Sequence, residues 1–189
     1  MARRKVYIVA HGETQVDKEG RVHGHLDPPL TLSGILAGKR NARKLKGKGI
    51  ERIYSSPRLR ARQTAALLAK ALGVPVEVRD ELVPWDLGRI SGAKAASIRP
   101  LIDFFSSRPT RAIPSGEPKA AVLTRYRKFI SGLKRGKNPI SGLKRGKNPV
   151  AISGHSQHTL GFDYASKGGD LSKVKMIGGK AGEVKEVLL

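Results

Sequence analysis

The chain has 189 residues, 39% of them hydrophobic and 28% charged, a composition that is typical of one folded domain and not of a disordered protein. Its 37 lysines and arginines against 15 acidic residues give a formal charge of +22, and it contains no cysteine. The absence of thiols excludes cysteine catalysis, disulfide frameworks, zinc–cysteine sites and iron–sulfur clusters.

Short apolar runs and helical patterns alternate along the first half of the chain. Residues 6–10 are apolar and rich in β-branched side chains, as in a buried parallel strand. Thr31 is expected to cap a helix that ends at about Leu45. The pattern then predicts a strand, a helix and another strand, at residues 50–55, 58–72 and 74–78.

The second half continues in the same way. Helices are expected over residues 95–105 and 117–130, a buried strand over 150–153, and an edge hairpin formed by the apolar segments of the tail, 174–177 and 184–187. Strands that alternate with helices predict an α/β fold, a three-layer α/β/α sandwich with a mainly parallel sheet in one domain spanning residues 1–189.

A ten-residue segment is duplicated in tandem. Residues 130–139 (ISGLKRGKNP) recur unchanged as residues 140–149. Each copy has two glycines, one proline and three cations, so neither should sustain a helix, and we expect most of residues 130–149 to form a solvent-exposed excursion. Two interpretations stay open: a duplication tolerated in a loop, or a basic arm that binds polyanions.

Two of the predicted strands end at a histidine next to a glycine. His11 follows residues 6–10, and His155 follows residues 150–153. Because ligands of open α/β sheets bind outside the carboxyl ends of the strands, the two imidazoles are expected to converge. Arg60 lies in the first turn of the helix that follows a third strand end, where main-chain amides and a guanidinium group can bind an anion such as a phosphoryl group.

These features sit within a longer series of motifs. In chain order the motifs lie at residues 10–14 (AHGET), 20–24 (GRVHG), 27–31 (DPPLT), 55–64 (SSPRLRARQT), 82–88 (LVPWDLG), 114–117 (PSGE) and 153–155 (SGH). Their order and spacing resemble the histidine phosphatase superfamily, the phosphoglycerate-mutase-like proteins, over nearly the whole chain. The resemblance implies a phosphoglycerate-mutase-like sandwich.

The same resemblance implies a mechanism. His11 would attack phosphorus to give a phosphohistidine, while His155 and Arg60 would bind the phosphoryl oxygens, and water would then hydrolyse the intermediate. Phosphoryl transfer needs mainly positioning and electrostatic stabilisation, so these residue types suit the roles without a metal or cofactor. Gly12, His23 and Gly24 would line the phosphate site.

Three positions depart from the family pattern. Ala10 stands where the family has an arginine, which removes a bidentate contact to phosphate. Asp17 stands where a pocket asparagine is usual, and its carboxylate would repel phosphate unless it is paired or turned away. Pro84 takes the place of the usual general-acid glutamate, so we assign that role to Asp86 of the same loop, against the alternative that Asp86 only shapes the turn.

Other residues have less specific predicted roles. Cations that could replace an arginine at position 10 are Lys5, Arg21, Arg62 and Arg89. Trp85 is expected in the core or as a wall of a pocket. His25 is expected at the surface, and His158 forms no convincing metal site with His155 because a third ligand is missing nearby.

Three functions follow from these observations. The first is a metal-independent phosphomonoester hydrolase, more a phosphatase than a mutase, that acts on a phosphorylated small molecule or phosphoprotein through phospho-His11. The second keeps the fold without turnover, as a pseudophosphatase that binds phosphorylated ligands or a partner. The third is a basic nucleic-acid-binding protein that uses the duplicated segment and the cationic residues 40–48.

The sequence also bears on location. No apolar run approaches the roughly 20 residues that a membrane-spanning helix needs, so we expect no contact with a membrane. The basic residues 3–5 are followed by only a short apolar stretch, unlike a signal peptide. With the lack of cysteine, this pattern favours a cytoplasmic protein.

Overall fold

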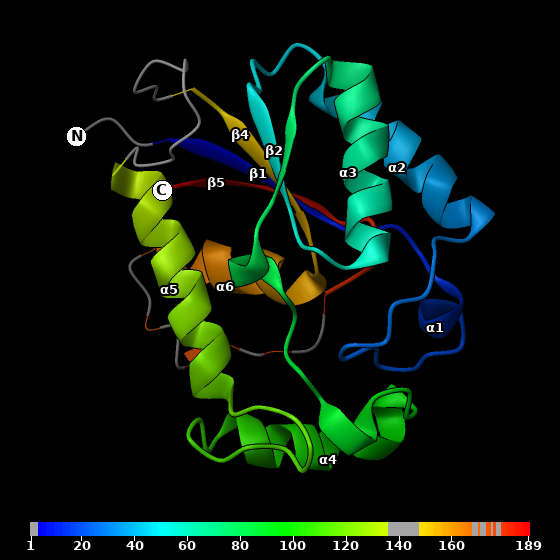
Figure 1. Cartoon of the computed structure of the whole chain (residues 1–189), viewed down its shortest axis with the longest axis vertical. Helices are drawn as coiled ribbons and strands as arrows, with labels where there is room; N and C mark the ends of the chain where they lie inside the picture. Colours follow the sequence, from blue (N-terminus) through cyan, green and yellow to red (C-terminus); the bar gives the residue numbers. More distant parts are fainter. Residues whose placement is uncertain (1–3, 136–147, 168–169, 171–172, 175, 177–178) are drawn as a thin grey trace.

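A five-stranded mixed sheet forms the centre of the molecule, and helices lie on both of its faces (Figure 1). The computed structural model describes residues 4–135, 148–167, 170, 173–174, 176 and 179–189. The strand order is β3-β2-β4-β1-β5. The strands are β1 (Lys5–Ala10), β2 (Arg52–Ser55), β3 (Val76–Val78), β4 (Val150–Gly154) and β5 (Val184–Leu188). The first four run parallel and β5 pairs antiparallel with β1, so the predicted sandwich with a mainly parallel sheet is confirmed.

Six α-helices and two short 3₁₀ helices are seen in the described part of the chain. The α-helices are α1 (Gln15–Lys18), α2 (Leu32–Leu45), α3 (Leu59–Leu72), α4 (Ala95–Ser106), α5 (Lys119–Arg135) and α6 (Ser156–Ser166). The 3₁₀ helices are η1 (Asp80–Leu82) and η2 (Gly88–Ile90). Thr31 caps α2 as expected, since its side chain accepts a hydrogen bond from the amide of Gly34. Within the residues described, no helix combines the length and apolarity needed to cross a bilayer.

The two faces of the sheet are buried by different helices. Side chains alternate along β1, so that Val6 and Ile8 join the apolar cluster under α5 and α6, whereas Tyr7 and Val9 join the cluster under α2 and α3. All four side chains are less than 5% exposed. This double burial explains why the strand reads as a continuous apolar run in the sequence.

A third cluster packs beyond the end of the sheet. It includes Trp85, Ile102, Phe105, Val122 and Tyr126, and it joins α4 to the lower part of α5 (Figure 1). The connection from β3 to α5 therefore forms a small lobe of its own beside the sheet, and this lobe faces the carboxyl ends of the strands.

Two predicted elements differ from the structure. The helix expected to end at residue 130 continues to Arg135, because Ile130 and Leu133 are both buried in the core and hold the first part of the duplicated segment in helical form despite Gly132. The remaining residues of the expected excursion, 136–147, lie outside the described residues, so their exposure and any polyanion binding stay predictions.

The expected edge hairpin is the second difference. Of its first arm, Val174 and Met176 are described, and neither lies in a strand; Val174 packs in the cluster under α5 and α6, and Met176 packs in the third cluster. Ile177 and Gly178 lie outside the described residues. The second arm is β5, which takes its hydrogen bonds from β1.

Candidate active site

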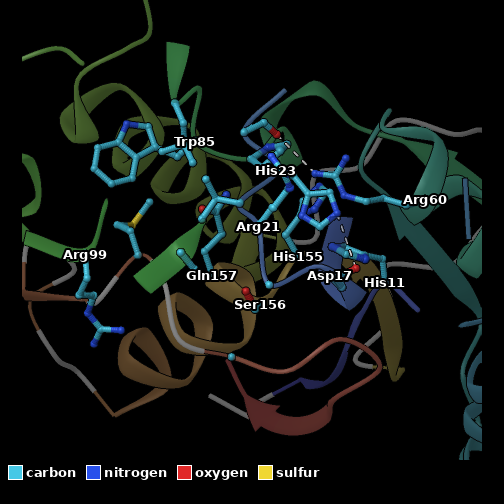
Figure 2. Close-up of a pocket in the computed structure, with 18 residues that line it drawn as sticks. His11, Asp17, Arg21, His23, Arg60, Trp85, Arg99, His155, Ser156 and Gln157 are labelled. Carbon is cyan, nitrogen blue, oxygen red and sulfur yellow. Dashed lines mark hydrogen bonds and ion pairs between the residues drawn. The ribbon is translucent and has the colours of Figure 1, made fainter. Parts of the chain in front are cut away.

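A cavity of about 360 Å³ opens at the carboxyl end of the sheet (Figure 2). Loops after β1 and β4 supply one part of its wall, and the lobe between β3 and α5 supplies another. Its lining residues are His11, Asp17, Gly20, Arg21, Val22, His23, Gly24, Arg60, Pro84, Trp85, Leu87, Ala95, Arg99, His155, Ser156, Gln157, Met176 and Gly179.

The convergence of His11 and His155 follows from the pairing of β1 with β4. Ala10 is the register partner of Gly154, and the amide of His11 donates to the carbonyl of Gly154 at 2.8 Å. The next residue of each strand is therefore a histidine, and the two ring centroids lie 5.3 Å apart. The structure brings together the pair that the sequence predicted.

His11 is held as a neutral imidazole with one defined tautomer. Its Nδ1 lies 2.9 Å from the carbonyl of Gly12, and because a carbonyl only accepts, Nδ1 carries the proton and Nε2 carries the lone pair. Burial, with the charge of Arg60 as a second cause, lowers the pKa of His11 to about 3. A free imidazole lone pair is thus present throughout the neutral range.

Arg60 reaches the cavity from the first turn of α3 and is 1% exposed. Its Nη1 donates to the carbonyl of Leu26 at 2.7 Å, its Nη2 donates to the carbonyl of Gly24 at 3.4 Å, and Asp27 lies 3.6 Å from Nη1. Burial lowers the pKa of Arg60 to about 10, which still leaves the guanidinium charged at neutral pH. These contacts fix the cation beside His11.

Three buried polar atoms of residues on the cavity lining have no hydrogen-bond partner among the described residues. They are Nε of Arg60, Nδ1 of His155 and Nε2 of Gln157. The other ring nitrogen of His155 shares a 2.9 Å hydrogen bond with Oγ of Ser56, which fixes the ring. Buried polar groups are nearly always paired in folded proteins, so unpaired atoms here are available to a polar ligand.

Asp17 is tied to Thr14 by a reciprocal capping box at the start of α1. Its Oδ2 accepts hydrogen bonds from the amide of Thr14 at 2.8 Å and from Oγ1 of Thr14 at 2.9 Å. Nε2 of His23 lies 2.8 Å from the same hydroxyl and 3.6 Å from the carboxylate. The side chain of Asp17 lies on the cavity lining, so its carboxylate is not turned away from the site. Burial raises the pKa of Asp17, and the charge of Arg60, which lowers that pKa, does not by itself outweigh burial.

The structure does not bring Asp86 to the cavity lining. Its Oδ1 accepts a hydrogen bond from the amide of Gly88 at 2.9 Å, and its Oδ2 lies 3.5 Å from His25, so its contacts are those of the turn-forming alternative. Pro84 does line the cavity. In the described part of the chain Asp17 is the one acidic residue on that lining.

The remaining predicted residues take different places. Gly24 lines the cavity, whereas Gly12 acts through its carbonyl group and through its close packing on Gly34. Trp85 both lines the cavity and packs in the third cluster, with its Nε1 donating to the carbonyl of Glu117 at 2.9 Å. His25 is partly exposed and lies off the lining.

Of the four cations weighed as replacements at position 10, Arg21 reaches the cavity lining. Its guanidinium pairs with Glu19 at 2.9 Å and donates to the carbonyl of Gly92 at 2.8 Å. Lys5 pairs with Glu186 at 3.4 Å on the surface, and Arg62 and Arg89 are exposed and off the lining.

Several lining or supporting residues were not singled out in the sequence. Ser56 positions His155. The sequence feature that could have pointed to Ser56 is its place at a strand end, just before the helix that carries Arg60. Gln157, Met176 and Arg99 also line the cavity, and Figure 2 labels Gln157 and Arg99 on its wall. No spacing in the sequence links these three, since they come from three separate segments.

His158 supports the site from below. It is fully buried, its Nδ1 accepts a hydrogen bond from the amide of His155 at 2.9 Å, and its ring fills the space where a Cβ on Gly154 would lie. Burial lowers its pKa from an ordinary 6.5 to about 3. It therefore positions the main chain of His155.

Stability should fall in acid because of such buried histidines. The folded-state pKa of His158 lies below its unfolded value, so between about pH 6.5 and 3 the unfolded chain binds more protons and folding weakens as the pH falls. From pH 6.5 to 5 we expect His158 to cost about 2 kcal/mol. Urea unfolding of wild type and His158→Asn at both pH values measures this; equal pH dependence in the two proteins would contradict it.

Comparison with known proteins agrees with this geometry. Residues 6–155 match the histidine phosphatase superfamily, branch 1. The chain is 32% identical over 135 residues to a probable phosphoglycerate mutase GpmB of Proteus mirabilis, covering 67% of this chain and 61% of that protein. It is 26% identical over 136 residues to a putative phosphoserine phosphatase 2 of Hydrogenobacter thermophilus, covering 69% and 67%. The chain thus spans less than two thirds of the Proteus protein's length.

Solved structures share the fold. A phosphoglycerate mutase of Thermus thermophilus superposes with a TM-score of 0.69 at 25% identity, covering 97% of this chain and 92% of that one. A mycobacterial glucosyl-3-phosphoglycerate phosphatase superposes with a TM-score of 0.77 at 24% identity, covering 95% and 86%. The relatives are phosphatases and mutases, and with the match over most of its length this chain belongs to the histidine phosphatase superfamily.

Proposed function

We propose that this protein is a phosphatase that hydrolyses phosphomonoesters through a phosphohistidine at His11, without a metal ion. The observation that carries the proposal is the neutral His11, whose lone pair is fixed on Nε2 at a cavity that it shares with the buried guanidinium of Arg60. A neutral nucleophile beside a fixed cation is what transfer of a dianionic phosphoryl group requires.

The remaining steps use groups on the same cavity. In the first step the Nε2 lone pair forms a bond to phosphorus while the bond to the leaving oxygen breaks, and Arg60 and His155 stabilise the charge on the phosphoryl oxygens. In the second step water attacks the phosphohistidine, releasing phosphate and returning the electron pair to Nε2. The unpaired Nε of Arg60 and Nδ1 of His155 support their assignment to this role.

The acidic residues near the site favour one class of substrate. Asp86 lies off the cavity lining, and Asp17 is held by Thr14 close to His23. Asp17 is thus the one carboxyl group on the described lining, and its hydrogen bonds from Thr14 favour its charged form. We therefore infer a preference for phosphates with good leaving groups, such as aryl phosphates, over alkyl phosphates.

The covalent intermediate gives the direct test. After brief reaction with an aryl phosphate and alkaline denaturation, we expect an acid-labile, base-stable phosphate on the protein. Tryptic cleavage separates the candidates, because the peptide of residues 6–18 contains His11 as its one histidine, while His23 and His155 fall in other peptides. Label on residues 6–18, unaffected by chelator, is the expected result; turnover with label elsewhere would overturn the proposal, and binding of phosphate without turnover would indicate the pseudophosphatase.

A further inference from the structure

Three potential metal ligands meet in the cavity. His11, Asp17 and His23 each offer a ring nitrogen or carboxylate oxygen, and these atoms all lie within 4.8 Å of one another. The rings of His11 and His23 stand edge to face with centroids 5.2 Å apart (Figure 2). A tetrahedral Zn²⁺ ion needs ligand atoms about 3.4 Å apart, so small side-chain rotations would close the cluster around an ion.

The donor set selects the kind of ion. Two imidazoles suit Zn²⁺ and other late first-row metals, and one carboxylate adds charge without making the site specific for Mg²⁺ or Ca²⁺, which prefer oxygen ligands throughout. The cavity beside the cluster leaves room for a water molecule or an anion to complete the coordination. Such an open three-ligand site is the usual form for a metal that exchanges its fourth ligand.

The surroundings already orient the ligands. The proton on Nδ1 of His11 is donated to the carbonyl of Gly12, which directs the Nε2 lone pair to a ligand. Oδ2 of Asp17 accepts from the amide and hydroxyl of Thr14, so Oδ1 stays free to coordinate. Metal ligands are commonly fixed by hydrogen bonds of this type. An imidazole ligand donates to a main-chain carbonyl group, and a carboxylate ligand accepts from nearby donors.

Charges of both signs lie at this place. Position 10, where an arginine was expected from the family pattern, holds a buried alanine, and position 17 holds an acid. Arg60 opposes a metal ion, but its own charge is shared with Asp27 and with the carbonyl groups of Leu26 and Gly24. A bound divalent ion would supply positive charge that Ala10 does not.

We propose that His11, Asp17 and His23 bind one divalent transition-metal ion, with Zn²⁺ as the representative. The ion takes the Nε2 lone pair of His11. Metal binding and phosphorylation of His11 therefore exclude each other. This mutual exclusion rests on the proposed phosphatase function, whereas the metal binding itself does not.

Metal binding is measured without any phosphate ester, so it is independent of turnover. Metal-free full-length protein is titrated with Zn²⁺ in a calorimeter and with Co²⁺ by visible absorption, and one ion per chain with the bands of low-coordinate Co²⁺ is expected. Loss of an outer-shell contact already weakens metal binding about 10- to 100-fold, so His23→Gln and Asp17→Asn should each weaken it about 100-fold or more.

His25→Gln is the matched control, because it removes a histidine two residues from His23 that lies outside the cluster, and it should bind Zn²⁺ as tightly as wild type. Failure of wild type to bind, or equal loss in His25→Gln and His23→Gln, overturns the site, and circular dichroism identifies any variant that does not fold. If wild type binds Zn²⁺ at this site, Zn²⁺ should abolish its hydrolysis of an aryl phosphate. A rate of hydrolysis that Zn²⁺ increases would show that metal binding and phosphorylation of His11 do not exclude each other.

Discussion

His11→Gln is expected to lower kcat/KM for an aryl phosphate about 10⁴-fold or more, because it removes the atom that would bond to phosphorus. Glutamine fills similar space, so the fold should remain. A stopped assay of released phosphate measures the effect, and circular dichroism checks folding.

The control for this change is again His25→Gln, whose side chain contacts the carbonyl of Pro84 and the carboxylate of Asp86 and is not itself part of the cavity lining. It should keep most of the activity. If wild type and His11→Gln hydrolyse the ester at the same rate, His11 is not the nucleophile and the observed hydrolysis belongs to another site or another protein.

The pH profile adds an independent check on the same residue. Since burial holds the pKa of His11 at about 3, its protonation should remove activity only as the pH approaches that value from above. An exposed histidine would lose its lone pair below about pH 6.5. If kcat/KM fell below about pH 6.5 and His11 lost its reactivity over the same pH range, the result would contradict a buried neutral nucleophile.

Gly12→Ala should lower stability strongly, because the strand end and helix α2 are in backbone contact there. A Cβ on Gly12 would lie 2.4 Å from the carbonyl oxygen of Gly34, and neither backbone can move alone. We expect the free energy of unfolding to fall by about 3 kcal/mol. Any displacement also moves the carbonyl that holds His11 and the amide that donates to Thr64, so kcat/KM should fall about 100-fold.

Gly132→Ala provides the comparison, since Gly132 lies within α5 with nothing within 4 Å of an added Cβ. It should raise the free energy of unfolding by about 1 kcal/mol and leave activity unchanged. Urea unfolding followed by fluorescence of Trp85 measures both variants. Equal stability of Gly12→Ala and wild type would show that the two backbones separate more easily than their packing indicates.

The sequence predicted the sheet and the histidine pair well because both depend on local patterns. Continuous apolar runs at residues 6–10 and 150–153 are typical of strands buried on two faces, and a glycine beside a histidine at each end shows where a ligand can approach. Because β1 and β4 pair in parallel, their carboxyl ends, and with them the two histidines, lie at the same edge of the sheet. The first and the last of the family motifs, at residues 10–14 and 153–155, overlap these same segments.

The parts that were missed depend on long-range packing. Helix α6 has no clear apolar stripe, because its side chains face the sheet, α5 and the cavity, so its sequence carries no amphipathic signal. Asp86 was assigned from its loop, but the side chain of a loop residue turns according to its nearest amide, here Gly88. The contact of Asp17 with His23 through Thr14 was also invisible, since it needs α1 and the following loop to fold back together.

The cavity wall combines residues that are held in two different ways. His11 and His155 are joined to the central strands by main-chain hydrogen bonds, whereas Trp85, Leu87 and Arg99 come from the lobe, whose apolar cluster also includes Val22 and Met176 from outside it. Substitutions in the lobe can therefore reshape that side of the cavity without displacing the main chain of His11 and His155. For the proposed phosphatase, this division offers a route to new selectivity during evolution through changes confined to residues 84–99.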